Sequence, residues 1–157
     1  MSLALKSFPD VRVAYMRHTG PYDGPGIANM WPRFIAACMA AGLKPITRRR
    51  FGVTLDDPST TPPTSCRYDA CVEVDAAFQP ASELAVRTLP GGLYATAPFV
   101  GTADNIDVAW RRFYTEGLPA SGHRPDARPP MEFYEANVAV DDATGRFSCE
   151  LCVAVRS

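Results

Sequence analysis

The chain has 157 residues, 46% hydrophobic and 21% charged, with a formal net charge of −1. This length suits one domain with a substantial core, so we expect a single domain over residues 1–157. The near-neutral charge argues against direct nucleic-acid binding by this chain and against an anionic membrane surface. The sequence lacks an apolar run long enough for a membrane helix and a recognisable signal peptide, and we expect a cytoplasmic protein.

The cysteines argue against a metal site. Five cysteines are an odd number, and their spacing does not form a compact disulfide framework. The pair at CxxC spacing, Cys149 and Cys152, falls in a segment with strand character. An odd separation on a strand sends the two side chains to opposite faces, so they cannot share an ion or a bridge. With His18 and His123 as the only imidazoles, we expect no metal, no cofactor, and reduced thiols.

The first half of the chain predicts a strand, a helix and two strands. The helix rests on apolar residues that recur at intervals of three and four from Ile27 to Met39, and Gly42 marks its end. Pro32 interrupts this stripe, so either the helix is kinked there or it begins only near Trp31. The expected elements lie near 11–19, 27–41, 49–55 and 66–74. We expect the basic run from Arg48 to Arg50 to lie in solvent at the start of a strand.

The second half repeats the scheme after a linker at 75–83. Its expected elements are a strand near 84–100, a helix near 104–117, and strands near 130–138 and 147–155. The Leu89-Pro-Gly-Gly92 run indicates a bulge or break in the first of these strands. Asp104 is a candidate helix cap, and the segment 141–145 has the composition of a hairpin loop.

Three matches between the halves predict an internal duplication. Trp31-Pro-Arg-Phe34 corresponds to Trp110-Arg-Arg-Phe113, and Gly20 and Gly101 end equivalent strands at nearly the same separation. A late apolar strand recurs in the same order. We therefore predict two pseudo-repeats, residues 11–74 and 84–155. Hairpins in place of parallel crossovers predict an α+β fold, with two helices packed on a mainly antiparallel sheet.

The segment 129–135 carries the candidate chemistry. On a strand, Glu132 and Tyr134 face the same way, while the equivalent position in the first half is Gly52. A partly desolvated carboxylate beside aromatic rings suits an organic cation, because charge interacts more strongly away from water and ring faces attract cations. Spacing alone leaves a second interpretation open, in which Glu132 lies on the solvated face of an edge strand.

Three motifs together resemble the GyrI-like family. They are Arg67-Tyr-Asp-Ala-Cys-Val-Glu-Val, Gly91-Gly-Leu-Tyr-Ala95 and Pro130-Met-Glu-Phe-Tyr134, and the similarity runs from about residue 11 to 155. That family includes gyrase-inhibitory proteins and the effector-binding domains of AraC-type and MerR-type multidrug regulators. The resemblance implies a pseudo-symmetric cleft into which Glu132 reaches to contact the ligand.

Five aromatic residues complete the candidate ligand site. Trp31 and Trp110 lie on helical stripes typical of a core, but the resemblance implies that these helices also wall the cleft. Tyr134 shares the face of Glu132 and is equally compatible with a place in the core. Tyr22 and Phe51 are further candidates.

Three functions remain open from the sequence. We favour a binding module that senses or sequesters a small, largely apolar, cationic drug-like molecule, as in the effector domain of a transcription regulator. The first alternative is a hydrolase of cyclopropane-bearing genotoxins, which some family members are, with Glu132 as the acid–base group. The second is a gyrase-modulating interaction protein. A helix-turn-helix is not evident, so a DNA-binding domain or a gyrase partner would lie outside this chain.

Overall fold

The computed structural model describes residues 1–80 and 83–157. Within them, eight strands form one antiparallel sheet in the order β1-β6-β8-β7-β3-β4-β2-β5. The strands are β1 (Ala4–Phe8), β2 (Val11–Thr19), β3 (Arg50–Thr54), β4 (Arg67–Glu73), β5 (Ala85–Leu89), β6 (Gly92–Gly101), β7 (Met131–Tyr134) and β8 (Phe147–Ala154). The helical elements are α1 (Gly26–Ala40), η1 (Pro45–Thr47), η2 (Pro63–Ser65), α2 (Ala103–Arg112), the π-helical turn η3 (Phe113–Gly117) and α3 (Leu118–Ser121).

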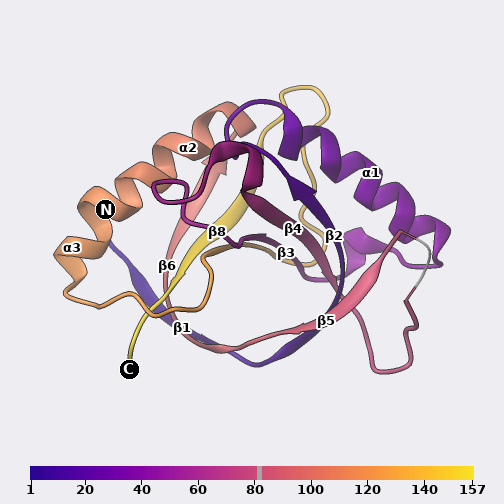
Figure 1. Ribbon diagram of the computed structural model, residues 1–157, viewed down its shortest axis with the longest axis horizontal. Helices are drawn as coiled ribbons and strands as arrows, with labels where there is room; N and C mark the ends of the chain where they lie inside the picture. Colours follow the sequence, from indigo (N-terminus) through magenta and orange to yellow (C-terminus); the bar gives the residue numbers. More distant parts are fainter. Residues whose placement is uncertain (81–82) are drawn as a thin grey trace.

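The predicted α+β architecture is confirmed. The sheet is strongly curled, and α1 and the α2–α3 segment lie on its outer side, one against each half (Figure 1). Each half contributes a strand, a helix and two strands, namely β2-α1-β3-β4 and β6-α2-β7-β8. The sheet order is symmetric about the β7–β3 pair, as two related halves require. The exact division into repeats at 11–74 and 84–155 stays a prediction, and Ala81 and Ser82 of the expected linker lie outside the described residues.

The strand prediction needs correction at three points. The strand expected near 130–138 is shorter, because β7 covers only Met131–Tyr134. Strand β1 was not predicted, because only Phe8 of its five residues is buried and the apolar alternation is weak. The expected strand at 84–100 is two strands, β5 and β6, which pair with different neighbours. The break falls at Pro90 and Gly91, where a Cβ on Gly91 would overlap the backbone that joins β1 to β2. The Pro-Gly-Gly signal therefore marks a break, one of the two predicted outcomes.

The positions at which the two helices begin also differ from the prediction. Helix α1 runs from Gly26 through Pro32 to Ala40, so a start near Trp31 is wrong. Pro32 is exposed, and solvent can satisfy the carbonyl that the missing proline N–H leaves unpaired. Helix α2 is capped by Thr102 and not by Asp104. The Thr102 N–H donates to Asn105 Oδ1 at 3.0 Å, the arrangement of a capping box.

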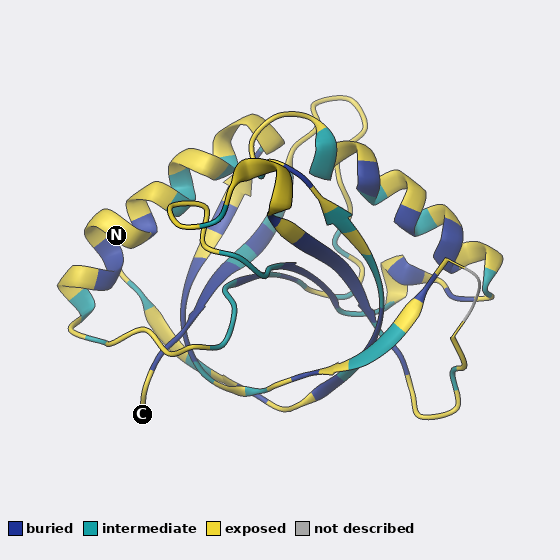
Figure 2. Cartoon of the chain, in the orientation of Figure 1, coloured by how far each residue is buried: buried dark blue, intermediate teal, exposed yellow. Residues whose placement is uncertain are grey.

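The core is divided between the two faces of the sheet. One cluster fills the inner, concave face, and two others lie between the outer face and the helices, one under α1 and one under α2–α3. Figure 2 shows the strands buried along much of their length and the outward sides of both helices exposed. Cys149 belongs to an outer cluster and Cys152 to the inner one, which confirms that they face opposite ways.

The inner face also holds an internal ion-pair cluster. Asp69 is fully buried, and its carboxylate accepts from Arg17 Nε at 2.8 Å and from Arg87 Nη2 at 2.8 Å. The described residues contain no group of three or more potential metal ligands. None of the helices within residues 1–80 and 83–157 is long and apolar enough to cross a membrane.

Candidate ligand-binding cleft

A cleft opens on the outer face where the two helices leave the centre of the sheet uncovered. Its volume is about 1990 Å³, and its walls come from α1 and α2 and its floor from β3, β4 and β7. Ligand sites in proteins usually enclose about 300–1,000 Å³. A drug-sized molecule therefore fits with space to spare, and the cleft can admit ligands of different shapes.

Glu132 lies at the centre of the cleft floor, at the symmetric middle of the sheet. Its cross-strand partner is Gly52 on β3, the residue that the repeat predicted as its counterpart. A Cβ on Gly52 would overlap the Tyr68 hydroxyl and the Glu132 carboxylate, and it would lie 2.8 Å from Tyr68 Cζ. The missing side chain at Gly52 therefore makes the space in which these two groups meet.

A chain of hydrogen bonds fixes the carboxylate. The Tyr68 hydroxyl donates to Glu132 Oε1 at 2.7 Å, and the Tyr134 hydroxyl donates to the same oxygen at 3.3 Å. Trp31 Nε1 in turn donates to the Tyr68 hydroxyl oxygen at 3.1 Å. Each donor comes from a different element, α1, β4 or β7, so packing of the whole domain holds the position of the carboxylate.

Burial controls the protonation of this cluster. Desolvation raises the pKa of Glu132 above its ordinary value, although hydrogen bonds from Tyr68 and Tyr134 act to lower it. The pKa of Tyr68 and that of Tyr134 lie well above the ordinary value, first because of burial and then because of the Glu132 charge. Both phenols therefore stay neutral donors, and Glu132 is the group that can change its charge.

Five of the predicted site residues line this one cleft. Trp31 and Trp110 stand on opposite walls, Glu132 and Tyr134 form part of the floor, and Tyr22 lies at one end. The ring centroids of Trp31 and Tyr134 are 5.6 Å apart. Trp110 stacks on Tyr114 at 6.0 Å with an angle of 24° between their rings.

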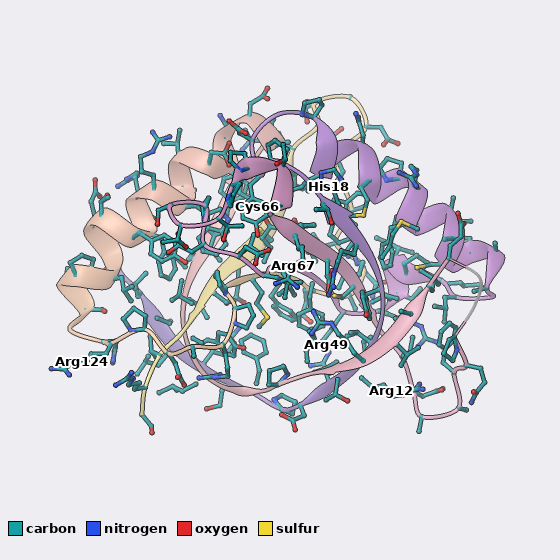
Figure 3. All side chains as sticks on the ribbon, in the orientation of Figure 1. Arg12, His18, Arg49, Cys66, Arg67 and Arg124 are labelled. Carbon is teal, nitrogen blue, oxygen red and sulfur yellow. The ribbon has the colours of Figure 1, made fainter. Side chains whose placement is uncertain are left out.

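Tyr22, one of the residues that line the cleft, is hydrogen-bonded to the start of β4. The Tyr22 hydroxyl donates to the carbonyl oxygen of Arg67 at 2.7 Å, and the Arg67 guanidinium pairs with Asp56. Figure 3 labels Arg67 and the preceding residue, Cys66. These contacts hold the loop that follows β3 against the start of α1.

Phe51 does not line the cleft. It follows the strand alternation to the inner face, because its neighbour Gly52 faces the cleft. There it is 1% exposed and packs on Phe133 with ring centroids 5.5 Å apart.

Among the lining residues that the sequence did not predict are Tyr68 and Arg50. Tyr68 could have been found, because it shares a strand face with Ala70, the partner of Gly52, and a void on one strand calls for a large side chain on its neighbour. The prediction that the whole run from Arg48 to Arg50 is solvated is wrong at its last residue. Arg50 is only 9% exposed.

Comparison with known families identifies the fold. The model of the GyrI-like small molecule binding domain matches residues 1–156. The chain belongs to this family. Among its relatives, the probable transcriptional regulator YgiV of Escherichia coli K12 is 34% identical over 136 residues, 84% of this chain and 82% of YgiV. A DNA gyrase inhibitor of Edwardsiella piscicida is 29% identical over 99% of both chains.

Solved structures share the fold of this GyrI-like domain at low sequence identity. The chain is similar to EcmrR in its DNA complex (TM-score 0.78, 18% identity, covering 99% of this chain and 57% of EcmrR). It is also similar to SAV2435 bound to tetraphenylphosphonium (TM-score 0.68, 14% identity, covering 100% and 95%). A third likeness is a hydrolase from Listeria innocua (TM-score 0.59, 9% identity, covering 99% and 92%).

Proposed function

We propose that this GyrI-like domain binds a small, largely apolar organic cation in the cleft, with Glu132 as its anionic anchor. The observation that carries the proposal is a carboxylate set among Trp31, Tyr68, Trp110 and Tyr134 on the floor of a large aromatic cleft. A carboxylate in such surroundings attracts a cation more strongly than one in water, and each ring face adds about 0.5–2 kcal/mol.

The comparisons support this ligand class and a regulatory role. SAV2435 was solved with tetraphenylphosphonium, an aromatic cation. YgiV carries the name of a probable transcriptional regulator, and EcmrR carries a similar domain within a longer DNA-bound chain. We propose that cation binding in this domain is sensed by an attached or associated regulator, or serves to sequester the compound.

The two tryptophans of the chain, Trp31 and Trp110, both line the cleft, so their fluorescence reports its occupancy. We expect methyltriphenylphosphonium to quench this fluorescence, and triphenylphosphine oxide, its neutral analogue, to bind far more weakly. Glu132→Gln keeps the shape of the side chain and removes the charge, and it should weaken phosphonium binding by more than about tenfold. Glu135→Gln is the matched control, because Glu135 lies on the same segment but is exposed and outside the cleft lining. Equal affinity of the wild-type protein and Glu132→Gln for the phosphonium would refute the anchor role.

A hydrolase is the second candidate function. The raised pKa of Glu132, together with two phenols that donate to it, is an arrangement suited to acid–base chemistry. The fold is shared with the Listeria innocua hydrolase. Incubation with an electrophilic cyclopropane followed by mass spectrometry separates the two candidates, because an enzyme converts many equivalents to a hydrolysed product and a binding domain protects at most one.

The DNA gyrase inhibitor of Edwardsiella piscicida supports a third candidate, a gyrase-modulating interaction protein. Such a protein would retain purified gyrase on an affinity column, and Glu132→Gln would leave that retention unchanged.

A further inference from the structure

Arg50 is a buried cation on the floor of the same cleft. It is 9% exposed and lies on β3, two residues before Gly52, so its side chain is on the cleft face. The guanidinium lies over the ring of Tyr134, with 5.8 Å between the guanidinium carbon and the ring centroid. Tyr134 therefore contacts Arg50 through its ring and Glu132 through its hydroxyl.

The hydrogen-bond partners of Arg50 are all neutral. Nη2 donates to the carbonyl oxygens of Glu135 at 3.1 Å and Val138 at 2.6 Å, and Nε donates to that of Arg48 at 3.3 Å. Among the described residues, none of its nitrogens has a carboxylate within salt-bridge distance. Nη1 makes no hydrogen bond to a described residue, and it is not among the buried polar atoms that lack a partner. Nη1 therefore keeps some exposure, and Arg50 is one of the residues that line the cleft.

Other arginines of the sheet are paired with carboxylates, unlike Arg50. Arg49 pairs with Glu73, and the buried Asp69 is shared by Arg17 and Arg87. Buried charges in proteins are generally paired, so an arginine that lines a ligand cleft with an exposed nitrogen and without a carboxylate partner needs a reason. Holding the 135–138 segment accounts for Nη2 and Nε but leaves Nη1 unexplained.

The strand register sets Arg50 and Glu132 at a fixed spacing. Arg50 is opposite Tyr134 and Gly52 is opposite Glu132, so the two charged residues occupy diagonal positions on one face of adjacent strands. Such positions are about 7–8 Å apart at their Cα atoms. The floor of the cleft thus presents one negative and one positive group that do not neutralise each other. The other charged residues that line the cleft are either exposed or paired. Solvent screens the exposed ones, which are Lys44, Asp57, Asp107, Arg111, Asp126 and Asp142. The half-buried ones are in ion pairs, Asp56 with Arg67 and Arg128 with Asp126.

We propose that Arg50 donates a hydrogen bond to an oxygen of the ligand and that the preferred ligand is a zwitterion. Its cationic end lies at Glu132, and its carboxylate accepts the hydrogen bond from Arg50 Nη1. This proposal rests on the proposed function, since it assumes that the cleft holds the ligand. Arg50 would be a second polar anchor beside Glu132, and the strands fix the spacing between the two charges. A ligand that contacts both residues gives the exposed guanidinium nitrogen a partner of opposite charge.

Two dyes that differ in a single charge test the subsite. Rhodamine B is a zwitterion at neutral pH, and its methyl ester keeps the same cationic ring system without the carboxylate. We expect the wild-type protein to bind rhodamine B more tightly than the ester in a fluorescence-polarisation titration. Arg50→Gln should lower the affinity for rhodamine B about tenfold or more relative to its effect on the ester. Arg50→Lys keeps the charge and should retain part of the preference.

The ratio of the two affinities separates this role from a structural one. If Arg50 only holds the 135–138 segment, Arg50→Gln weakens both dyes equally and the ratio is unchanged, which overturns the proposal. A Glu132→Gln effect on methyltriphenylphosphonium together with an unchanged dye ratio in Arg50→Gln overturns this inference and leaves the proposed function standing. A wild-type protein that binds neither dye nor the phosphonium contradicts both.

Discussion

Gly52→Ala adds one methyl group to the floor of the cleft and should displace Tyr68 and Glu132. The backbone of Gly52 lies in a regular strand, so alanine is conformationally acceptable there. The added methyl group, however, would overlap the Tyr68 hydroxyl and the Glu132 carboxylate and would lie 2.8 Å from Tyr68 Cζ. Tyr68 is 1% exposed and cannot swing away, so the Tyr68–Glu132 hydrogen bond must break or the strands must shift.

The expected loss of stability in Gly52→Ala has two causes. Overpacking a well-filled site costs about 1–3 kcal/mol, and losing a hydrogen bond to a charged group costs about 1.5–3 kcal/mol. We therefore expect Gly52→Ala to lower the free energy of unfolding by roughly 3 kcal/mol, a large share of the 5–15 kcal/mol typical of a domain. Displacement of Glu132 should also weaken methyltriphenylphosphonium binding by about tenfold or more.

Urea unfolding followed by fluorescence gives the stability, and phosphonium titration gives the affinity. Gly101→Ala is the matched control, because the atoms nearest its Cβ would be side-chain atoms of Phe99 and Asn105, at 2.9 and 3.1 Å, and neither residue lines the cleft. It should destabilise less and leave the affinity unchanged. In a Tyr68→Phe background, the cost of Gly52→Ala should shrink, since the hydroxyl that the methyl group meets is gone. Wild-type stability and affinity in Gly52→Ala would refute the packing argument.

Four further predictions concern charges and hydrogen bonds, three of them in the cleft and one on the inner face of the sheet. Burial raises the pKa of Glu132 above its ordinary value of 4.5. As the pH is lowered, the carboxylate is therefore protonated, and the phosphonium affinity should begin to fall, at a pH above that value. Calorimetric titrations at several pH values should show no such fall in Glu132→Gln. The same shift means that the folded state holds this proton more tightly than the unfolded state, so the unliganded protein should gain stability as pH falls through that window, and Glu132→Gln should abolish the gain in urea unfolding. Tyr68→Phe, which loses a 2.7 Å bond, should reduce cation affinity more than Tyr134→Phe, which loses a 3.3 Å bond; the reverse order in fluorescence titrations would contradict the network. Asp69→Ala leaves Arg17 and Arg87 without their carboxylate partner on the inner face. It should destabilise the fold by about 3–5 kcal/mol without changing the phosphonium affinity. A large change in affinity in the folded variant would show that the two faces of the sheet are coupled.

Local patterns were enough to predict most of the fold. The strands near 11–19, 49–55, 66–74 and 147–155 and the apolar stripes of both helices rest on side-chain periodicity, and the structure places them close to the predicted ranges. The errors lie where a tertiary contact decides. Strand β1 exists because it pairs with β6, and Thr102 caps α2 because Asn105 folds back to its N–H. Neither contact leaves a periodic signal in the sequence.

The site was predictable in part for the same reason. Strand alternation was sufficient to place Glu132 and Tyr134 together, and it also takes Phe51 to the opposite face once Gly52 is assigned to the cleft. Tyr68 and Arg50 come from strands that are neighbours only in the folded sheet. The burial of Arg50 depends on carbonyl groups from the 135–138 segment, far along the chain, which its own sequence neighbourhood does not indicate.

If the cleft holds an organic cation against Glu132, a crystal structure of the wild-type protein with methyltriphenylphosphonium will show it there. We expect the phosphonium between Trp31 and Trp110, with Glu132 as the nearest carboxylate. A phosphonium bound outside the cleft, or one held inside it by a different carboxylate such as Asp107, would rule out Glu132 as the anchor.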